Sequence, residues 1–232
     1  MSGLGLGLGL GLGGHRIVDR YGNKPATFSI PAGFANTGTK RINFSEPVTV
    51  TMTGGVTLSI GGTPYQSGDT IPVATTYHTL TINNPGVDAG TITFGKRKQI
   101  TYLYLNNLGS SVITGDITGM KLTSLYLRNI GSSLTYGTNS LNITFNLGIQ
   151  LLGDTVFSAS EYIRLFADAA TCVTDGKWTA STKVMTISGG DNPGWSNVSE
   201  YYGTIVGGGV TVKVPLAWES GVDPFPPETL NP

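Results

Sequence analysis

The chain has 232 residues, enough to bury a core, and only 12% of them are charged, with 14 basic and 14 acidic side chains. This balance excludes the strongly basic surface of a nucleic-acid-binding protein, so no nucleic-acid partner is expected. A single cysteine, Cys172, excludes an internal disulfide framework and a cysteine-based zinc site, and it is expected to be a buried small hydrophobe. The 34 glycines, with many Thr, Ser and Asn, are typical of β-rich extracellular or virion proteins.

The first segment, residues 1–25, contains a strict alternation of glycine and leucine over residues 3–13. In an extended strand all five leucines share one face, whereas in a helix they scatter and each glycine costs about 1 kcal/mol. A lone strand has no ladder, so the run predicts docking to another copy or to a groove in an assembly. The alternative is a flexible glycine-rich tail. The residues assigned to assembly docking are Leu4, Leu6, Leu8, Leu10 and Leu12.

The same run does not fit two common kinds of N-terminal segment. No basic residue precedes the leucines, which disfavours a secretory signal peptide. The apolar alternation stops at residues 14–16, well short of the ~20 residues that a transmembrane helix needs. We therefore expect no membrane span.

Residues 26–76 predict a small β domain or cap of short antiparallel strands. The β-type runs are residues 27–30, 41–44, 48–53 and 56–60, which are rich in β-branched and aromatic residues. Gly54-Gly55 lies between the last two runs and predicts a two-residue hairpin, while Gly61-Gly62 marks a following turn. The pattern favours a β-sandwich-like unit.

Residues 77–214 contain an internal repeat. Residues 100–111 align with residues 122–133 at an offset of 22 (122 − 100), and both copies contain the same L-Y-L core. A weaker copy is predicted upstream around Leu80 and Ile82, and a degenerate one follows around Ile143, Phe145 and Leu147. A period of 20–23 residues with this pattern is the leucine-rich-repeat signature, with one short parallel strand per repeat. Such units bury their leucines only against neighbours, which predicts a short solenoid with a cap at each end.

The end of this region has the signals of an α/β cap. Ser158 or Ser160 is a candidate N-cap for a helix through Ile163, Leu165 and Phe166. The segments that follow predict a strand at 184–187, a second helix over 197–206 that ends at 207–209, and a strand at 210–214. The predicted fold is therefore mainly β with a minor α component: a β-sandwich-like N-terminal cap, a short leucine-rich-repeat solenoid and an α/β C-terminal cap.

With these motifs, residues 77–214 resemble the short leucine-rich-repeat proteins of phages and prophages of Bacteroidetes. The matching segments are T-G-D-I at 114–117 and L-T-x-L-Y-L at 122–127, and the Gly-Leu start also resembles the start of some of these proteins. The resemblance implies a repeat fold and a role in the virion. The chain differs from the family pattern in having few repeats and a drifting period, which weakens the case for a long curved binding surface.

Catalytic chemistry has little material in this sequence. There are two histidines, His15 and His78, no G-x-S-x-G, H-E-x-x-H or Walker pattern, and no tight local pair of acidic residues. Asp116 is expected to hydrogen-bond local backbone, and the cluster at 96–98 is expected to be a solvated loop. The prediction is that the chain is not an enzyme and uses no cofactor and no metal. A glycan-degrading fibre with a carboxylate pair assembled by the fold is the minor alternative.

A ligand, if there is one, would meet the outward residues of the repeat strands. With Leu103 and Leu105 inside, alternation turns the side chains of two neighbouring rows outward. Tyrosine faces beside planar donors suit a sugar or a peptide, but the same tyrosines could instead act as cross-strand pairs that stabilise the sheet. The candidate ligand surface consists of Tyr102, Tyr104, Asn106, Tyr126 and Arg128.

Residues 215–232 form a proline-rich tail that contains Trp218 and Phe225. The prolines disfavour a helix and predict an extended arm. The alternatives are a disordered tail and an arm whose rings pack on a neighbouring subunit.

Together these features predict a phage virion structural protein: a small fibre, decoration or tail-associated subunit. The Gly-Leu peptide would dock it among other virion proteins, and the repeats would be displayed for contact with a host-surface glycan or protein. A homo-oligomer is expected, with a trimer inferred by analogy with fibre proteins. The alternative is a bacterial cell-surface adhesin built on the same repeats, and the glycan-degrading fibre is the second alternative.

Overall fold

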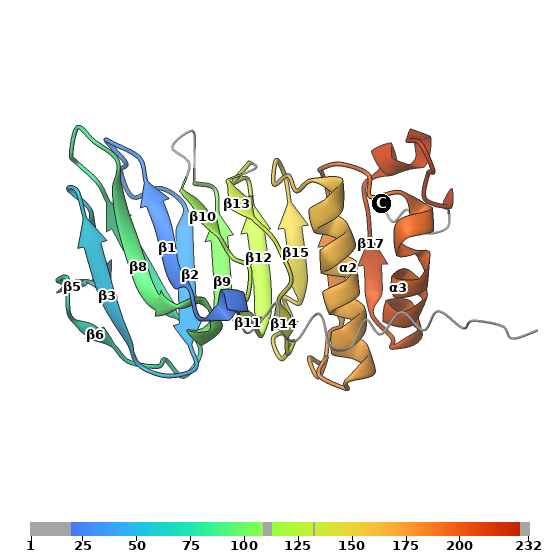
Figure 1. Ribbon diagram of the computed structural model, residues 1–232, viewed down its shortest axis with the longest axis horizontal. Helices are drawn as coiled ribbons and strands as arrows, with labels where there is room; N and C mark the ends of the chain where they lie inside the picture. The colour runs from blue at the N-terminus through green and yellow to red at the C-terminus, as the bar shows by residue number, and fades with distance from the viewer. Residues whose placement is uncertain (1–19, 109–112, 132, 228–232) are drawn as a thin grey trace, which may run out of the picture.

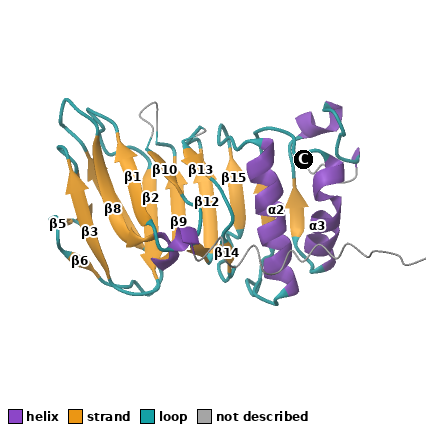
Figure 2. Ribbon diagram, viewed as in Figure 1, coloured by secondary structure: helices purple, strands orange, loops and turns teal. Residues whose placement is uncertain are grey.

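The computed structural model describes residues 20–108, 113–131 and 133–227, so the Gly-Leu run and its five leucines lie outside the described residues. Two large sheets and the helices α2 and α3 make up most of the described chain (Figures 1 and 2). The prediction of a mainly β protein with a minor α component is confirmed. None of the helices in the described part is long and apolar enough to cross a membrane.

Nine strands form the larger sheet. In spatial order they are β17 (Thr211–Lys213), β16 (Val184–Ile187), β15 (Ile149–Leu152), β12 (Ser124–Arg128), β9 (Ile100–Asn106), β2 (Thr39–Phe44), β7 (His78–Asn83), β4 (Thr57–Ile60) and β5 (Thr63–Tyr65). The strands from β17 to β9 pair in parallel, whereas β2, β7, β4 and β5 pair antiparallel. One sheet thus has a parallel half and an antiparallel half.

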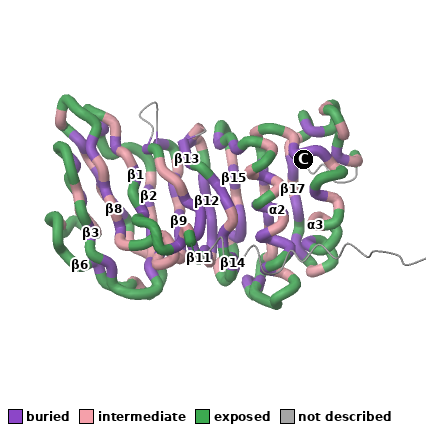
Figure 3. Tube along the Cα trace, viewed as in Figure 1, coloured by how far each residue is buried: buried purple, intermediate pink, exposed green. Residues whose placement is uncertain are grey.

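A second layer faces this sheet. It contains the six-stranded sheet β13 (Leu134–Thr135), β10 (Thr114–Asp116), β1 (Pro25–Ile30), β8 (Gly90–Lys96), β3 (Val48–Thr53) and β6 (Thr70–Ile71). A small parallel pair, β11 (Lys121–Leu122) and β14 (Ser140–Leu141), lies beside it. Towards the C-terminus, α2 (Ala159–Thr174) and α3 (Trp195–Gly207) take the place of strands (Figure 2). Apolar side chains fill the space between the layers, and Figure 3 shows the buried segments along the central strands.

The predicted 22-residue repeat gives the register of β9 with β12 in the parallel half. Leu125 pairs with Leu103 and Leu127 with Leu105, and all four side chains are buried. Asn107 and Asn129 follow the two strands with positive φ angles of 55° and 51°, and the Asn129 amide donates to the Asn107 side-chain oxygen. Asparagine tolerates this left-handed backbone better than most residues, which explains its place at the end of each strand.

Two predicted repeat copies are wrong. The degenerate copy around Ile143, Phe145 and Leu147 is not the next strand, because β15 pairs Ile149 with Leu125, at an offset of 24 (149 − 125). The weak upstream copy belongs to β7, which runs antiparallel to β2 and is separated from β9 by that strand. The apolar alternation correctly predicts a strand here, but that strand, β7, pairs with β2 and β4 of the preceding segment.

The hairpin predicted at Gly54-Gly55 is also wrong. The strands on either side of it, β3 and β4, belong to different sheets, so the two glycines turn the chain from one layer to the other. The two-residue hairpin lies instead at Gly61-Gly62, where β4 pairs with β5. Both of these glycines have positive φ angles, 56° and 86°, as the tight turns favoured in hairpins require.

The α/β end of the chain follows the sequence signals closely. Helix α2 begins after Ser158 with a capping box, in which the backbone N–H of Ser158 donates to the Glu161 carboxylate at 2.8 Å. Helix α3 ends at the predicted glycines, and β16 has the predicted bounds. Cys172 is buried on α2, as expected.

The tail departs from its prediction of an extended arm. Residues Leu216–Ser220 form a 3-10 helix, and Trp218 and Phe225 are buried against the same chain. The Trp218 indole packs on Tyr162 of α2 and donates to the Gly190 carbonyl oxygen at 3.1 Å. Burial of these rings outweighs the extended preference of the prolines.

Candidate functional site

The outward face of the nine-stranded sheet carries a row of stacked planar side chains. Tyr104 of β9 and Tyr126 of β12 are register partners, with ring centroids 4.2 Å apart and planes 9° from parallel. On the other side of Tyr104, Arg41 of β2 places its guanidinium carbon 5.0 Å from the ring centroid. The same guanidinium lies 4.6 Å from the ring of Tyr77. We call Tyr77, Arg41, Tyr104 and Tyr126 the stacked row.

The stacked row leaves little free aromatic face. Tyr126 has 8% of its surface exposed, and Tyr104 has Tyr126 on one side and Arg41 on the other. Burial raises the pKa of Tyr104, and the neighbouring Tyr126 raises it further. The rings therefore serve to hold Arg41 in place across three strands, and the cation–π contacts contribute to that fixation.

Tyr102 occupies the outward side of β9 but does not reach the surface. Its exposed fraction is 1%, because Tyr77 stacks on it at 5.4 Å and Phe145 meets its ring edge at 5.0 Å. Burial raises its pKa to about 12. Alternation gave the correct face for Tyr102, but the expectation that it is open to a ligand is wrong, because loop side chains cover it.

Asn106 and Arg128 are adjacent on β9 and β12, one pleat beyond the tyrosines. Arg128 is exposed, and the Asn106 amide nitrogen lies 3.5 Å from the Tyr104 hydroxyl. The structure thus brings Tyr104, Asn106 and Arg128 together at the surface, whereas Tyr126 is buried and Tyr102 lies beneath Tyr77. Arg41 and Tyr77 were missed, since pairing of β2 with β9 joins residues 63 positions apart (104 − 41), which no local pattern signals.

Two polar atoms near the stacked row are buried and have no hydrogen-bond partner: Arg41 Nε and Asn106 Oδ1. The two residues are diagonal neighbours, because Arg41 pairs with Tyr104 and Thr39 pairs with Asn106. Buried polar atoms are nearly always satisfied, and because both atoms lie below the surface their expected partner is an internal water molecule.

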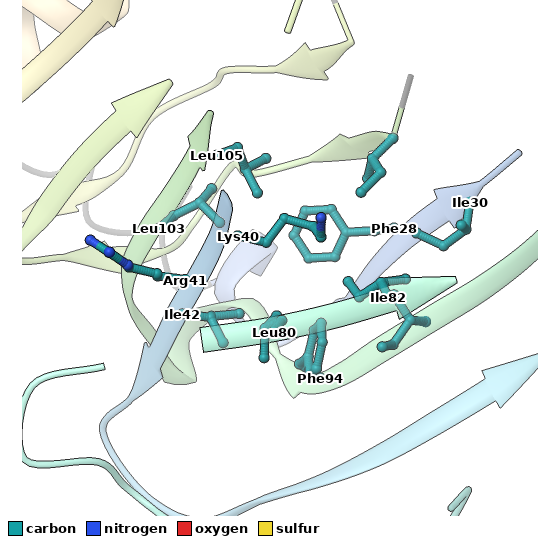
Figure 4. Close-up of a pocket in the computed structure, with 12 residues that line it drawn as sticks. Phe28, Ile30, Lys40, Arg41, Ile42, Leu80, Ile82, Phe94, Leu103 and Leu105 are labelled. Carbon is teal, nitrogen blue, oxygen red and sulfur yellow. The ribbon is translucent and has the colours of Figure 1, made fainter. Parts of the chain in front are cut away.

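Lys40 and Asp168, whose pKa values are also shifted, lie inside the protein. Lys40 points from β2 into an apolar cavity of about 20 Å³, on the opposite face of the strand from Arg41 (Figure 4). Its Nζ donates to the Thr37 carbonyl oxygen at 2.7 Å, and burial lowers its pKa to about 8. The cavity has room for about one water molecule, so it is not a site for a larger ligand.

Asp168 is the buried acid of the parallel half. Burial raises its pKa to about 8, although the Asn139 backbone N–H and the Tyr136 hydroxyl both donate to its Oδ2, at 2.7 and 2.9 Å. These contacts attach α2 to the segment between β13 and β14. The role of Asp168 is therefore explained by packing within the chain.

Asp116 hydrogen-bonds local backbone as predicted, accepting from the Thr118 N–H at 2.9 Å. Burial raises its pKa, but hydrogen bonds from Thr118 and Arg97 outweigh burial and leave the pKa below the usual value. The partner Arg97 was expected in a solvated loop, and this expectation is wrong. Arg97 lies in a 3-10 helix (Arg97–Gln99), forms an ion pair with Asp116 at 2.6 Å and contacts the Pro25 carbonyl oxygen.

Within the described residues, no three His, Cys, Asp or Glu side chains gather as a metal site. Comparison of the chain with protein-family models, with curated proteins and with solved structures found no match.

Proposed function

We propose that the chain is a non-enzymatic virion structural protein that displays the outward face of its nine-stranded sheet. The supporting observation is the stacked row, in which side chains of three strands hold one cation, Arg41, at the outward face. A rigid, preorganised polar surface is typical of a recognition site. The phage setting is supported by the resemblance of the repeat segments and by the Gly-Leu run.

In this proposal the N-terminal run docks the protein and the sheet face points outward. Residues 3–13 would add a strand to another virion protein or to a second copy, with Leu4, Leu6, Leu8, Leu10 and Leu12 on the buried face. The subunit would be a fibre, decoration or tail-associated protein, and a trimer is the expected assembly. The cell-surface adhesin and the glycan-degrading fibre are the competing functions.

The first experiment purifies native particles and searches for this chain by mass spectrometry. We expect the chain to co-purify with particles in a fixed ratio to other virion proteins. Recovery only as a free soluble monomer would contradict the proposal, and recovery in cell-envelope fractions without particles would favour the adhesin. Cleavage of a polysaccharide that is lost when one carboxylate is replaced would favour the glycan-degrading fibre.

A second experiment tests docking by the Gly-Leu run. Deletion of residues 2–14 should abolish incorporation into particles. The matched control replaces the five leucines by serine, which keeps the length and the glycines but removes the apolar face. We expect this control to fail as well, and normal incorporation of either variant would contradict docking through the leucines.

A further inference from the structure

The outward face of the nine-stranded sheet has a one-sided charge. At the outward strand positions of this sheet the charged side chains are Arg41, Arg128 and Lys213, and all three are basic. The whole chain carries 14 basic and 14 acidic residues, so the acidic residues lie elsewhere. The strand positions of this face therefore carry positive charge only, and a partner of the opposite sign fits them.

The three cations are spread across the sheet. With neighbouring strands roughly 4.8 Å apart, Arg128 lies about 10 Å across the strands from Arg41, and Lys213 lies about 14 Å beyond Arg128. A ligand that contacts all three must be extended and must carry acidic groups at intervals. A linear polyanion meets these requirements, whereas a small monoanion meets only one cation.

Arg41 has the geometry of a carboxylate receptor. Its guanidinium carbon lies 4.6 Å from the ring centroid of Tyr77 and 5.0 Å from that of Tyr104, and the residue is partly exposed. Arginine binds carboxylates through paired N–H donors, and fixation before binding lowers the entropy cost of that contact.

Several of the remaining outward side chains are polar, while Leu152 beside Arg128 and Val184 beside Thr211 are apolar. Gln150 and Thr186 continue the row of Tyr126 on β15 and β16, and Thr39 lies beside Asn106. Peptides bind by adding a strand to a sheet edge or by filling an apolar groove. The middle of a sheet offers no free backbone edge, and hydroxyl and amide groups match the hydroxyls of a sugar.

We propose that this face binds an acidic polysaccharide, with sugar carboxylates on Arg41 and Arg128. The inference rests on the proposed display function, because it identifies the ligand of the displayed face. Lys213 extends the contact along the chain of sugars. The stacked tyrosines position Arg41 and do not themselves stack on the sugar rings.

The test measures binding of the full-length protein to oligogalacturonate by calorimetry, with a neutral galactose oligomer of the same length as the comparison. We expect binding of the acidic oligomer that weakens as NaCl is raised, and no measurable binding of the neutral oligomer. In the double variant Arg41→Gln/Arg128→Gln, the dissociation constant should rise at least about tenfold.

Lys121→Gln is the matched control, since Lys121 is an exposed cation on β11, away from this face. It should bind like the wild type. The variant Arg41→Lys keeps the positive charge but lacks the planar guanidinium. Its affinity should lie between that of the wild type and that of the double variant. Circular dichroism of each variant checks that it is folded.

Several outcomes would overturn the inference. They are equal binding of the neutral oligomer, no binding of the acidic oligomer, and unchanged affinity in the double variant. Binding of polyglutamate but not of oligogalacturonate would also overturn it and identify an acidic peptide as the ligand. The proposed function has its own test, which is the presence of the chain in particles. If the chain is found in particles but binds no oligogalacturonate, only this inference is contradicted.

Discussion

Among the described residues, the antiparallel and parallel halves of the molecule each bury one basic or acidic side chain, and they do so in different ways. Lys40, in the antiparallel half, is 1% exposed and has a carbonyl oxygen and the Phe34 ring at 5.6 Å as its contacts. Asp168, in the parallel half, accepts two hydrogen bonds from groups on another segment. Among the described residues, neither forms an ion pair. Lys40 thus has a single hydrogen-bond acceptor, whereas the Asp168 carboxyl belongs to a hydrogen-bond network.

The difference teaches that burial alone does not assign a role. Asp168 joins α2 to the preceding coil, so its loss leaves two donors without an acceptor. Lys40 joins no two elements, because its acceptor Thr37 lies three residues away, next to its own strand. We therefore expect Asp168 to be needed for stability and Lys40 to lower it.

The largest effect is expected for Asp168→Ala. At pH 5 the variant should lose about 3 kcal/mol of unfolding free energy, because the Tyr136 hydroxyl and the Asn139 N–H lose their acceptor and a cavity opens. Asp168→Asn is the control that keeps an acceptor, and it should lose less than about 1 kcal/mol at this pH. Urea titration measures both, and equal losses in the two variants would refute the network role.

The pH dependence of Asp168 sharpens this prediction. Its pKa is raised from 3.8 to about 8 by burial, so the folded protein binds the proton more tightly than the unfolded chain. The stability that the neutral acid provides is complete below pH 3.8 and is lost as pH rises towards 8. Relative to wild type, Asp168→Asn should therefore gain stability between pH 4 and pH 8, and a constant difference over this interval would contradict the shift.

Lys40→Met should have a smaller effect of the opposite sign. Methionine has a similar length and no charge, so at pH 7 we expect about 2 kcal/mol of added unfolding free energy. The pKa of Lys40 is lowered from 10.5 to about 8, so the wild type recovers stability as pH rises from 8 to 10.5. The advantage of the variant should shrink over that interval.

The exposed residue Lys121 again provides the control for this comparison. Lys121→Met lies on the surface of β11 and should change the unfolding free energy by less than about 0.5 kcal/mol. A Lys40→Met variant that is destabilised at pH 7 would show that Lys40 does stabilise the antiparallel half.

Local sequence patterns predicted single strands and helices well, but they predicted poorly which strands pair with one another. Alternation and capping act within a few residues, so they placed β3 and β16 and gave Ser158 as one of two candidate N-caps of α2. The 22-residue repeat also gave the register of β9 with β12, because the same sequence occurs twice. These predictions depend only on short-range geometry.

Strand neighbours depend on pairing across long stretches of chain. The turn at Gly54-Gly55 does not reveal that β3 and β4 belong to different sheets. For the candidate site, the faces of Tyr104, Tyr126 and Arg128 followed from alternation, but Arg41 beside Tyr104 and the cover over Tyr102 did not. The candidate site was therefore only partly predictable. The repeat predicted the strands β9 and β12, but Arg41 comes from β2, in the antiparallel half of the molecule.

The smallest effect is expected at the contact between the two halves, in the stacked row. A double-mutant cycle with Tyr104→Leu and Tyr126→Leu should give a coupling of about 1 kcal/mol, as stacked aromatic pairs do beyond the area they bury. The same cycle between Arg41→Gln and Tyr104→Leu should give about 0.5 kcal/mol, the value of an exposed cation–π contact. Thermal or urea unfolding of the single and double variants provides both numbers. Zero coupling in the first cycle would mean that the tyrosines are merely adjacent, and Arg41 would then lack the rigid support that binding of a carboxylate requires.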